Sequence, residues 1–235
     1  KTFSGVNVLR NVNFTLEPGE VHALVGENGA GKSTFVKILS GVYTPTDGDI
    51  FLDNKKIKIN TPIAAQKNGV SLIHQEPQSF SHLSVAENIF MGHMDGNNFS
   101  RVKWKDINKS SEKILSSIGL KIDPKNIMEG LSIADQQMIE IAGALSKNSK
   151  ILIMDEPTSP LTPNEVGKLF DIVNQLKAQG MAIIFISHRL EEIRSIANRV
   201  TIFRDGDLIT TQKINEITNE EIIKYMIGRS IEDID

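Results

Sequence analysis

The octet Gly26-Glu27-Asn28-Gly29-Ala30-Gly31-Lys32-Ser33 decides the fold of this chain. It matches the pattern G-x-x-x-x-G-K-[ST] of a phosphate-binding loop. Its glycines can take backbone angles that other residues avoid, so that successive N–H groups turn inward around an anion. Lys32 adds a cation for the β- and γ-phosphates of a nucleotide, and the Ser33 hydroxyl can ligate Mg²⁺. The octet therefore predicts a nucleotide site.

The residues on both sides of the octet supply the structural context that this loop needs. Val21–Val25 has the apolar character of a short buried strand. The stretch from Ser33 to Leu39 places Phe35 and Ile38 at helical spacing, and Gly41 is a plausible stop. The loop thus opens a helix, whose N-terminus favours phosphate. A chance glycine turn is disfavoured because strand, loop and helix are all present.

The composition bounds the remaining possibilities. The 235 residues suffice for one large domain or two small ones, and the net charge of −3 disfavours a nucleic-acid partner, although a local basic patch stays open. Without cysteine, disulfides and thiolate metal sites are excluded. The apolar runs are far shorter than the roughly 20 residues of a membrane helix. No signal peptide is visible, and a start at Lys1 rather than Met predicts a fragment.

The first part of the chain has strand character. Val12, Phe14 and Leu16 alternate with polar residues, and Pro18-Gly19 can turn the chain. Residues 49–59 resemble a hairpin, with Asn54-Lys55 at its turn. These segments predict an antiparallel sheet edge near the phosphate loop.

Residues 82–147 differ in character and predict a mainly helical insertion. Trp104–Ile118 and Ile133–Leu145 show helical rhythm, and the polar stretch Gly92–Ser100 predicts an exposed loop.

From about residue 150 strands and helices alternate. Lys150–Met154 and Ala182–Ser187 predict strands, whereas Asn164–Gln179 and Leu190–Ala197 predict helices. This alternation is typical of a parallel sheet with helical crossovers. A hairpin follows, with its favoured turn at Asp205-Gly206.

A second chemical motif stands at the end of a predicted buried strand. Ile151–Met154 leads into Asp155 and Glu156. Because successive strand side chains point in opposite directions, we expect different tasks for the two acids. Asp155 can hold the Mg²⁺ shell, and Glu156 can polarise an attacking water. A merely superficial acidic strand end is disfavoured by the phosphate loop upstream.

Ser132 and Asp135 fit the capping-box pattern S-x-x-[DE] and predict a helix start. In isolation this would be an ordinary capped helix. Its position shortly before the acidic strand favours a functional interpretation.

With these motifs in this order, the chain resembles the nucleotide-binding subunit of an ABC transporter over essentially its whole length. The resemblance implies an α/β fold of the P-loop NTPase (RecA-like) type, with a parallel sheet core, an antiparallel β subdomain and a helical subdomain. It implies a single nucleotide-binding domain over 1–235. The β edge and the ATPase core would occupy 1–81 and 148–235, and the helical subdomain 82–147.

The resemblance also implies roles for individual residues. Lys32, Gln75, Glu156 and His188 would be catalytic, and Mg²⁺ would be held by Ser33, Gln75 and Asp155. A lone His or Gln is more often structural, and only the order and spacing of the motifs set Gln75 and His188 apart. The residues that would bind ATP are Phe3, Gly26, Glu27, Asn28, Gly29, Ala30, Gly31, Lys32, Ser33, Thr34 and Ser132.

Three stretches are similar to ATPases of ribose-, xylose- and galactoside-type sugar importers and of the autoinducer-2 importer: His22–Thr34, Gln136–Ala142 and Ile186–Leu190. Those proteins carry two ATPase modules in one polypeptide. Gly228–Asp233 resembles the join before their second module, so we predict that this chain is the N-terminal half of a tandem ATPase.

Two departures from the family pattern affect this prediction. Ile133, Ala134 and Asp135 replace the Gly-Gly-Gln of a typical signature, which predicts a working but weaker site. Thr162 stands where an Asp is usual, so communication between two ATP sites would be less direct.

The implied function is hydrolysis of ATP with Mg²⁺ to power the import of a solute, which is expected to be a carbohydrate. The chain would be peripheral and would lie at the cytoplasmic face of the cell membrane. The implied partners are a second nucleotide-binding module (its own tandem half or a second copy), a transmembrane permease that contacts Pro77–Val85, and indirectly an extracellular solute-binding protein. Two alternatives stay open. One is a non-transport ABC ATPase acting on DNA or ribosomes, and the other is a regulatory half that holds nucleotide without turnover.

Overall fold

The computed structural model describes residues 1–91 and 104–228 of the chain. The predicted loop Gly92–Ser100 and all but the first residue of the predicted join Gly228–Asp233 lie outside the described residues.

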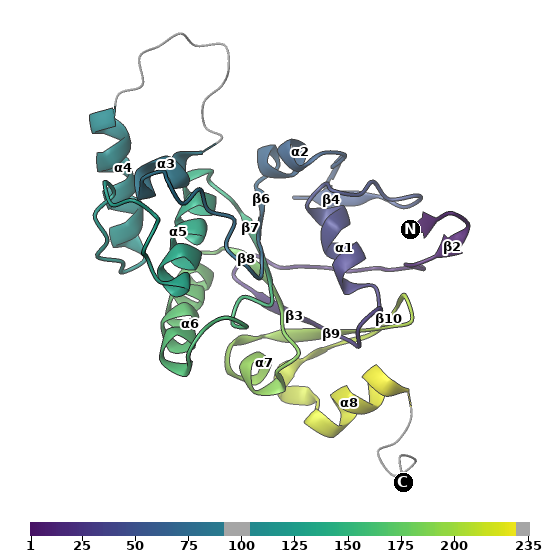
Figure 1. Ribbon diagram of the computed structural model, residues 1–235. Helices are drawn as coiled ribbons and strands as arrows, with labels where there is room; N and C mark the ends of the chain where they lie inside the picture. Colours follow the sequence, from purple (N-terminus) through teal and green to yellow (C-terminus); the bar gives the residue numbers. More distant parts are fainter. Residues whose placement is uncertain (92–103, 229–235) are drawn as a thin grey trace.

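A six-stranded sheet forms the centre of the molecule (Figure 1). Its strands are β3 (Val21–Val25), β6 (Val70–Ile73), β7 (Ile151–Asp155), β8 (Ala182–Ile186), β9 (Arg199–Arg204) and β10 (Asp207–Lys213). They lie in the order β10-β9-β3-β8-β7-β6, and all pairs are parallel except β9 with β10. The predicted parallel sheet with helical crossovers is confirmed.

Helices cover both faces of this sheet. They are α1 (Lys32–Leu39), α2 (Pro62–Lys67), α3 (Val85–Phe90), α4 (Trp104–Ser117), α5 (Ile133–Ser146), α6 (Pro163–Ala178), α7 (Leu190–Ile196) and α8 (Asn219–Ile227), with a 3₁₀ turn at Ile214–Glu216. In Figure 1, α3, α4, α5 and α6 lie on one side of the sheet and α1 and α2 on the other. The two helices predicted between residues 104 and 145 are confirmed.

Alternation along the buried strands divides the core into two hydrophobic clusters. Ala23 and Val25 join a cluster with the helices α3 to α8, whereas Leu24, between them, packs into a second cluster with α1 and α2. All five residues of β3 are buried. A strand buried on both faces is expected to be mainly apolar, and this explains four of the five residues of Val21–Val25. The exception is His22, whose buried Nε2 is hydrogen-bonded with Thr201 Oγ1 at 2.7 Å.

The antiparallel part consists of two small ribbons besides the β9–β10 pair. They are formed by β1 (Thr2–Phe3) with β2 (Val6–Asn7), and by β4 (Ile50–Leu52) with β5 (Lys55–Ile57). The second ribbon confirms the predicted hairpin, but its turn is at Asp53-Asn54, whose φ angles of 50° and 59° fit a type I′ turn.

The strand expected around Phe14 is not formed. Val12, Phe14 and Leu16 are half-buried against the second cluster and their neighbours Asn13 and Thr15 are exposed, so the predicted alternation is present. Nevertheless, within residues 1–91 and 104–228 this segment pairs with no other strand. Apolar alternation specifies which face of a segment is buried, but it does not specify a hydrogen-bonding partner.

Candidate functional site

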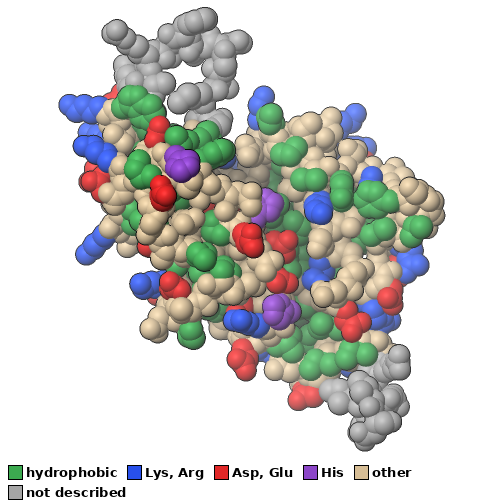
Figure 2. Space-filling model, in the orientation of Figure 1, with side chains coloured by type: hydrophobic (Ala, Val, Ile, Leu, Met, Phe, Trp, Pro, Cys, Tyr) green, Lys and Arg blue, Asp and Glu red, His purple; other side chains and the backbone are tan. Residues whose placement is uncertain are grey.

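Four adjacent parallel strands end at the same edge of the sheet, and each leads into a predicted motif. The order β3-β8-β7-β6 brings together the phosphate loop after Val25, the segment Ser187-His188, Glu156, and the segment His74-Gln75. Carboxyl edges of this kind are where open α/β sheets bind ligands. Figure 2 shows acidic, basic and histidine side chains along the middle of one face of the molecule.

The phosphate loop has the backbone of an anion cradle. Gly26, Gly29 and Gly31 have φ angles of 153°, 84° and 105°. A Cβ at Gly26 would lie 2.4 Å from the carbonyl oxygen of Phe203, so the loop packs directly on β9. Helix α1 begins after Gly31 without a side-chain cap. Its first N–H groups therefore remain available to an anion such as a nucleotide phosphate.

Lys32 lies folded over this loop. Its Nζ donates hydrogen bonds to the carbonyl oxygens of Gly26, at 2.6 Å, and Glu27, at 3.1 Å. Burial lowers the pKa of Lys32, and the negative charges of Glu156 and Asp155 oppose that shift. The ammonium group thus faces both acids across the edge of the sheet.

The two acids at the end of β7 interact with each other. Burial raises the pKa of Asp155, and the charge of Glu156 raises it further, while His74, Lys32 and Lys37 act in the opposite direction. Glu156 has a left-handed backbone, with φ 47°, so the chain leaves the strand at this residue. The expected alternation therefore ends at Asp155, because the strand itself ends there.

Glu156 also meets the end of the neighbouring strand. Its Oε2 lies 3.5 Å from Nδ1 of His188, and Ser159 Oγ donates to the same oxygen at 3.4 Å. His188 is exposed, and so is Gln75, which follows β6 after His74. The structure thus brings Lys32 and Asp155 to the edge that also carries Gln75, Glu156 and His188.

The candidate metal donors fit a magnesium site completed by phosphate. No group of three or more His, Cys, Asp or Glu side chains in residues 1–91 and 104–228 could hold a metal ion on its own. The oxygen donors at the edge are instead the Ser33 hydroxyl, the Gln75 amide and the Asp155 carboxylate. Mg²⁺ prefers this kind of set, with one or two carboxylates and the oxygens of a nucleotide.

Two predicted residues lie apart from this edge. The Phe3 ring packs edge-on against Tyr43, with 5.0 Å between centroids, and Lys1 Nζ lies 4.8 Å above it. Ser132 caps α5, and the described contacts do not join it to the phosphate loop. Its Oγ accepts from the Asp135 N–H at 3.1 Å and donates to Asp135 Oδ2 at 2.9 Å.

The predicted helix start at Ser132 is therefore confirmed. In a capping box the acidic side chain accepts a hydrogen bond from the backbone N–H of the capping residue. Here the Asp135 carboxylate instead accepts a hydrogen bond from the Ser132 hydroxyl.

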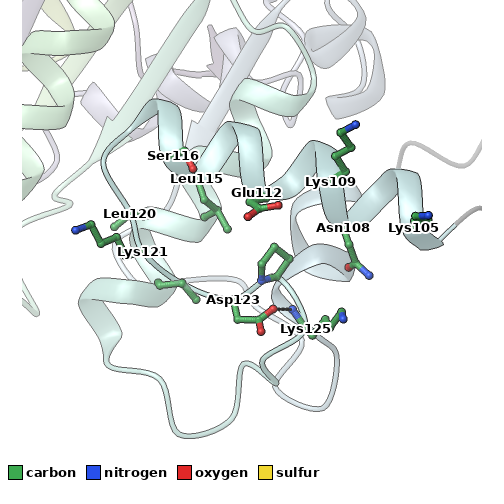
Figure 3. A pocket seen from close by; sticks show the side chains of 12 residues that line it. Lys105, Asn108, Lys109, Glu112, Leu115, Ser116, Leu120, Lys121, Asp123 and Lys125 are labelled. Carbon is green, nitrogen blue, oxygen red and sulfur yellow. Dashed lines mark hydrogen bonds between the residues drawn. The ribbon is translucent and has the colours of Figure 1, made fainter.

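A large cleft elsewhere is not part of this site. It has a volume of about 870 Å³ and lies between α4 and residues 120–125 (Figure 3). Four exposed lysines line it together with Glu112 and Asp123, and no predicted site residue lines it. The lysines are Lys105, Lys109, Lys121 and Lys125.

Sequence reasoning missed two acids that support the edge. Glu192 in α7 binds the loops after β7 and β8. Glu140 in α5 lies beside the backbone of His74 and Gln78, on either side of Gln75. For Glu140, the signal that could have indicated a supporting role was its position as a glutamate inside an otherwise apolar helical stretch. Glu192 lies next to Glu191 at the charged start of a short helix, and the sequence does not show which of the two glutamates is buried.

Comparison with known proteins agrees with this geometry. The family profile described as ABC transporter matches residues 9–159. "Ribose import ATP-binding protein RbsA 2" of Streptomyces avermitilis is 46% identical over 100% of this chain and 46% of its own length. "Ribose import ATP-binding protein RbsA" of Clostridium tetani is 47% identical over 99% of this chain and 46% of its own length. The chain thus spans about half the length of these relatives.

The fold has a solved counterpart. The crystal structure of the ADP conformation of an ATP-binding cassette of an ABC transporter superposes with a TM-score of 0.84 at 24% identity, covering 97% of this chain and 96% of that one. The chain therefore belongs to the ABC transporter family, and its fold is that of an ATP-binding cassette. Within the described residues, no helix has the length and apolar character to span a bilayer.

Proposed function

We propose that this chain hydrolyses ATP with Mg²⁺ and that it powers the import of a carbohydrate through a separate permease. The observation that carries the proposal is the shared sheet edge, where Lys32, Glu156 and His188 follow three adjacent strands. The relatives that are named as ribose import ATP-binding proteins support the choice of solute class.

Each residue at the edge has a task that its position supports. Lys32 offsets the charge of the β- and γ-phosphates, and Glu156 orients and polarises the attacking water. His188, next to Glu156, contacts the γ-phosphate. Ser33, Gln75 and Asp155 hold Mg²⁺, which when bound neutralises charge on the phosphate oxygens.

Nucleotide binding involves two further regions. The backbone N–H groups of Gly26–Thr34 surround the phosphates. Phe3, whose ring is held by Tyr43, stacks on the adenine. We also propose that residues 1–235 form one nucleotide-binding domain, with residues 82–147 as its helical subdomain.

A second module completes the site. Ser132, at the exposed start of α5, has no described contact with its own phosphate loop, and it acts instead on nucleotide bound by a partner module. That partner is the second half of a tandem chain or a second copy of this one. The relatives are about twice as long as this chain, which favours the tandem arrangement.

One observation favours a second candidate function, nucleotide binding without turnover by the chain alone. The Ser132 hydroxyl already donates to the Asp135 carboxylate of its own helix. That carboxylate would also repel a nearby γ-phosphate. A module with this signature would bind nucleotide but leave hydrolysis to a site completed by another module.

The permease contacts the exposed residues that follow β6. The chain is peripheral and lies at the cytoplasmic face of the membrane. An extracellular solute-binding protein acts on the opposite side of that membrane. Phe80 is 56% exposed, and its backbone is fixed by Asn88, whose Oδ1 accepts its N–H at 2.8 Å. Val85, the last residue of the predicted contact stretch, is buried in α3 and takes no part.

The test is ATP hydrolysis across a series of protein concentrations, with Lys32→Ala as the blank. A specific activity that rises with concentration and vanishes in the blank supports a working dimer. Binding of ATP without turnover at every concentration supports the second candidate. That result contradicts the proposed hydrolysis, and absence of both binding and turnover contradicts both candidates.

A further inference from the structure

The carboxylate of Glu192, in the first turn of α7, is buried and joins two loops. Its Oε2 accepts hydrogen bonds from Thr158 Oγ1 and from Ser187 Oγ, each at 2.7 Å. Its Oε1 lies 3.2 Å from Nη1 of Arg189. The Glu192 side chain is only 9% exposed, so all three donors converge on a largely desolvated acid.

The two loops are those that carry Glu156 and His188. Thr158 follows β7 two residues after Glu156, and Ser187 directly precedes His188. Both residues are buried, at 2% and 4% exposure. Glu192 is therefore a bridge between the ends of β7 and β8, beneath the 3.5 Å approach of Glu156 to His188.

Both neighbours of His188 are held by this bridge. The Arg189 N–H donates to Ser187 Oγ at 3.0 Å, while the Arg189 guanidinium pairs with Glu192. The backbone on each side of His188 is thus fixed to the same carboxylate. The imidazole itself is exposed, and these bonds hold the two residues that flank it.

A simpler role for Glu192 would be to stabilise the N-terminus of α7 by its charge. Glu191 lies in the same turn, is exposed, and can supply that stabilisation in full. Burial of a carboxylate is unfavourable unless donors compensate for the lost water. The three donors at Glu192, all from segments that carry Glu156 or His188, therefore point to a task beyond the helix terminus.

We propose that Glu192 is a positioning residue for ATP turnover, which holds Glu156 and His188 in register across two strand ends. The inference rests on the proposed function. Glu192 itself touches neither nucleotide nor water, and it acts through Thr158 and Ser187. Its loss lets the two loops move independently, so that water and γ-phosphate are no longer aligned with Glu156.

The test compares three variants of the full-length protein by the kinetics of ATP hydrolysis. Glu192→Met keeps the side-chain volume but accepts no hydrogen bond, and it lowers kcat by about 10- to 100-fold with KM for ATP changed by less than about twofold. Glu192→Gln keeps one acceptor oxygen and loses less. Glu191→Met, the matched control, keeps the wild-type kcat.

Hydrogen exchange supplies a readout that does not depend on turnover. Glu192→Met increases exchange in residues 156–161 and 186–190 while β3 and α6 stay protected. Wild-type kcat in Glu192→Met, an equal loss in Glu191→Met, or exchange that rises throughout the chain overturns the inference. If the wild-type protein binds ATP but never turns it over, the proposed function fails, and exchange in the two loops alone decides the role of Glu192.

Discussion

Nδ1 of His188 lies 3.5 Å from Oε2 of Glu156, although 31 residues separate them in the chain. They meet because β7 and β8 are adjacent and parallel, so that both strands end at the same level. The left-handed backbone of Glu156 turns the chain out of β7 at this point. The pair forms the part of the candidate site where a water and a γ-phosphate would react.

Replacement of this acid separates binding from turnover. Glu156→Gln removes the carboxylate proposed to polarise water but keeps the side-chain shape, so we expect ATP binding to stay within about twofold while hydrolysis falls by about 10²- to 10⁴-fold. Equilibrium binding of a fluorescent ATP analogue and steady-state phosphate release measure the two effects. Hydrolysis at the wild-type rate would show that Glu156 is not the base.

Two glycines of the phosphate loop differ in how much a methyl group disturbs them. Gly29→Ala suffers only from its positive φ, because a Cβ there meets no atom of the described residues within 4 Å. It destabilises the protein by about 1–2 kcal/mol. Gly26→Ala also clashes with the carbonyl oxygen of Phe203, which adds about 1–3 kcal/mol. Urea denaturation without nucleotide measures both variants, and equal losses would contradict the close packing of the loop on β9.

The pH dependence of stability depends on Glu140. Burial raises its pKa from 4.5 to about 7, and backbone hydrogen bonds from His74 and Gln78 and the charge of Lys147 oppose that rise. Between these two pKa values the folded state keeps a proton that the unfolded state releases. The free energy of unfolding therefore decreases as pH rises through this window, by about 3 kcal/mol for this group alone.

Glu140→Gln removes the decrease in the free energy of unfolding that Glu140 causes as pH rises. The variant gains stability relative to the wild type as pH rises from 5 to 8, and urea denaturation across that range follows the difference. Glu112→Gln, at an exposed acid of α4, serves as the control with an unchanged slope. A constant difference between Glu140→Gln and the wild type at every pH would rule out a titrating Glu140.

The proposed permease contact depends on one aromatic side chain. Phe80→Ala weakens the binding of the permease by about 10-fold or more, because exposed aromatic residues carry much of the energy of an interface. ATP hydrolysis by the isolated protein stays unchanged. Phe51, on β4, is exposed to a similar extent, 62% against 56%, and Phe51→Ala is the matched control. Equal effects of the two substitutions in the assembled transporter would place the contact elsewhere.

Local patterns in the sequence predicted much of the candidate site. The octet at Gly26 and the strand that ends in Asp155 are each recognisable within a few residues, and the alternation of strands and helices after residue 150 predicted the parallel sheet. Helices α2 and α3 span six residues each, too few for a helical period to be detected. The sequence patterns also did not indicate β6 or α8.

Contacts between distant residues were beyond the reach of such patterns. The bond from Thr158 to Glu192 joins residues 34 apart, and no local signal marks either as buried. The segment from Val12 to Leu16 shows the opposite case. Its burial pattern was predicted correctly, but the absence of a strand partner is a property of the whole sheet.

The position of β8 between β3 and β7 has a consequence for synthesis of the chain. The ribosome completes the phosphate loop and Asp155 well before residue 182, where β8 begins. Until then β3 and β7 have no strand between them, because each pairs with β8 rather than with the other. A nascent chain that ends at Asp155 thus holds the phosphate loop and Asp155 without the strand that lies between them. The candidate site is complete only when the segment leading to His188 has been made.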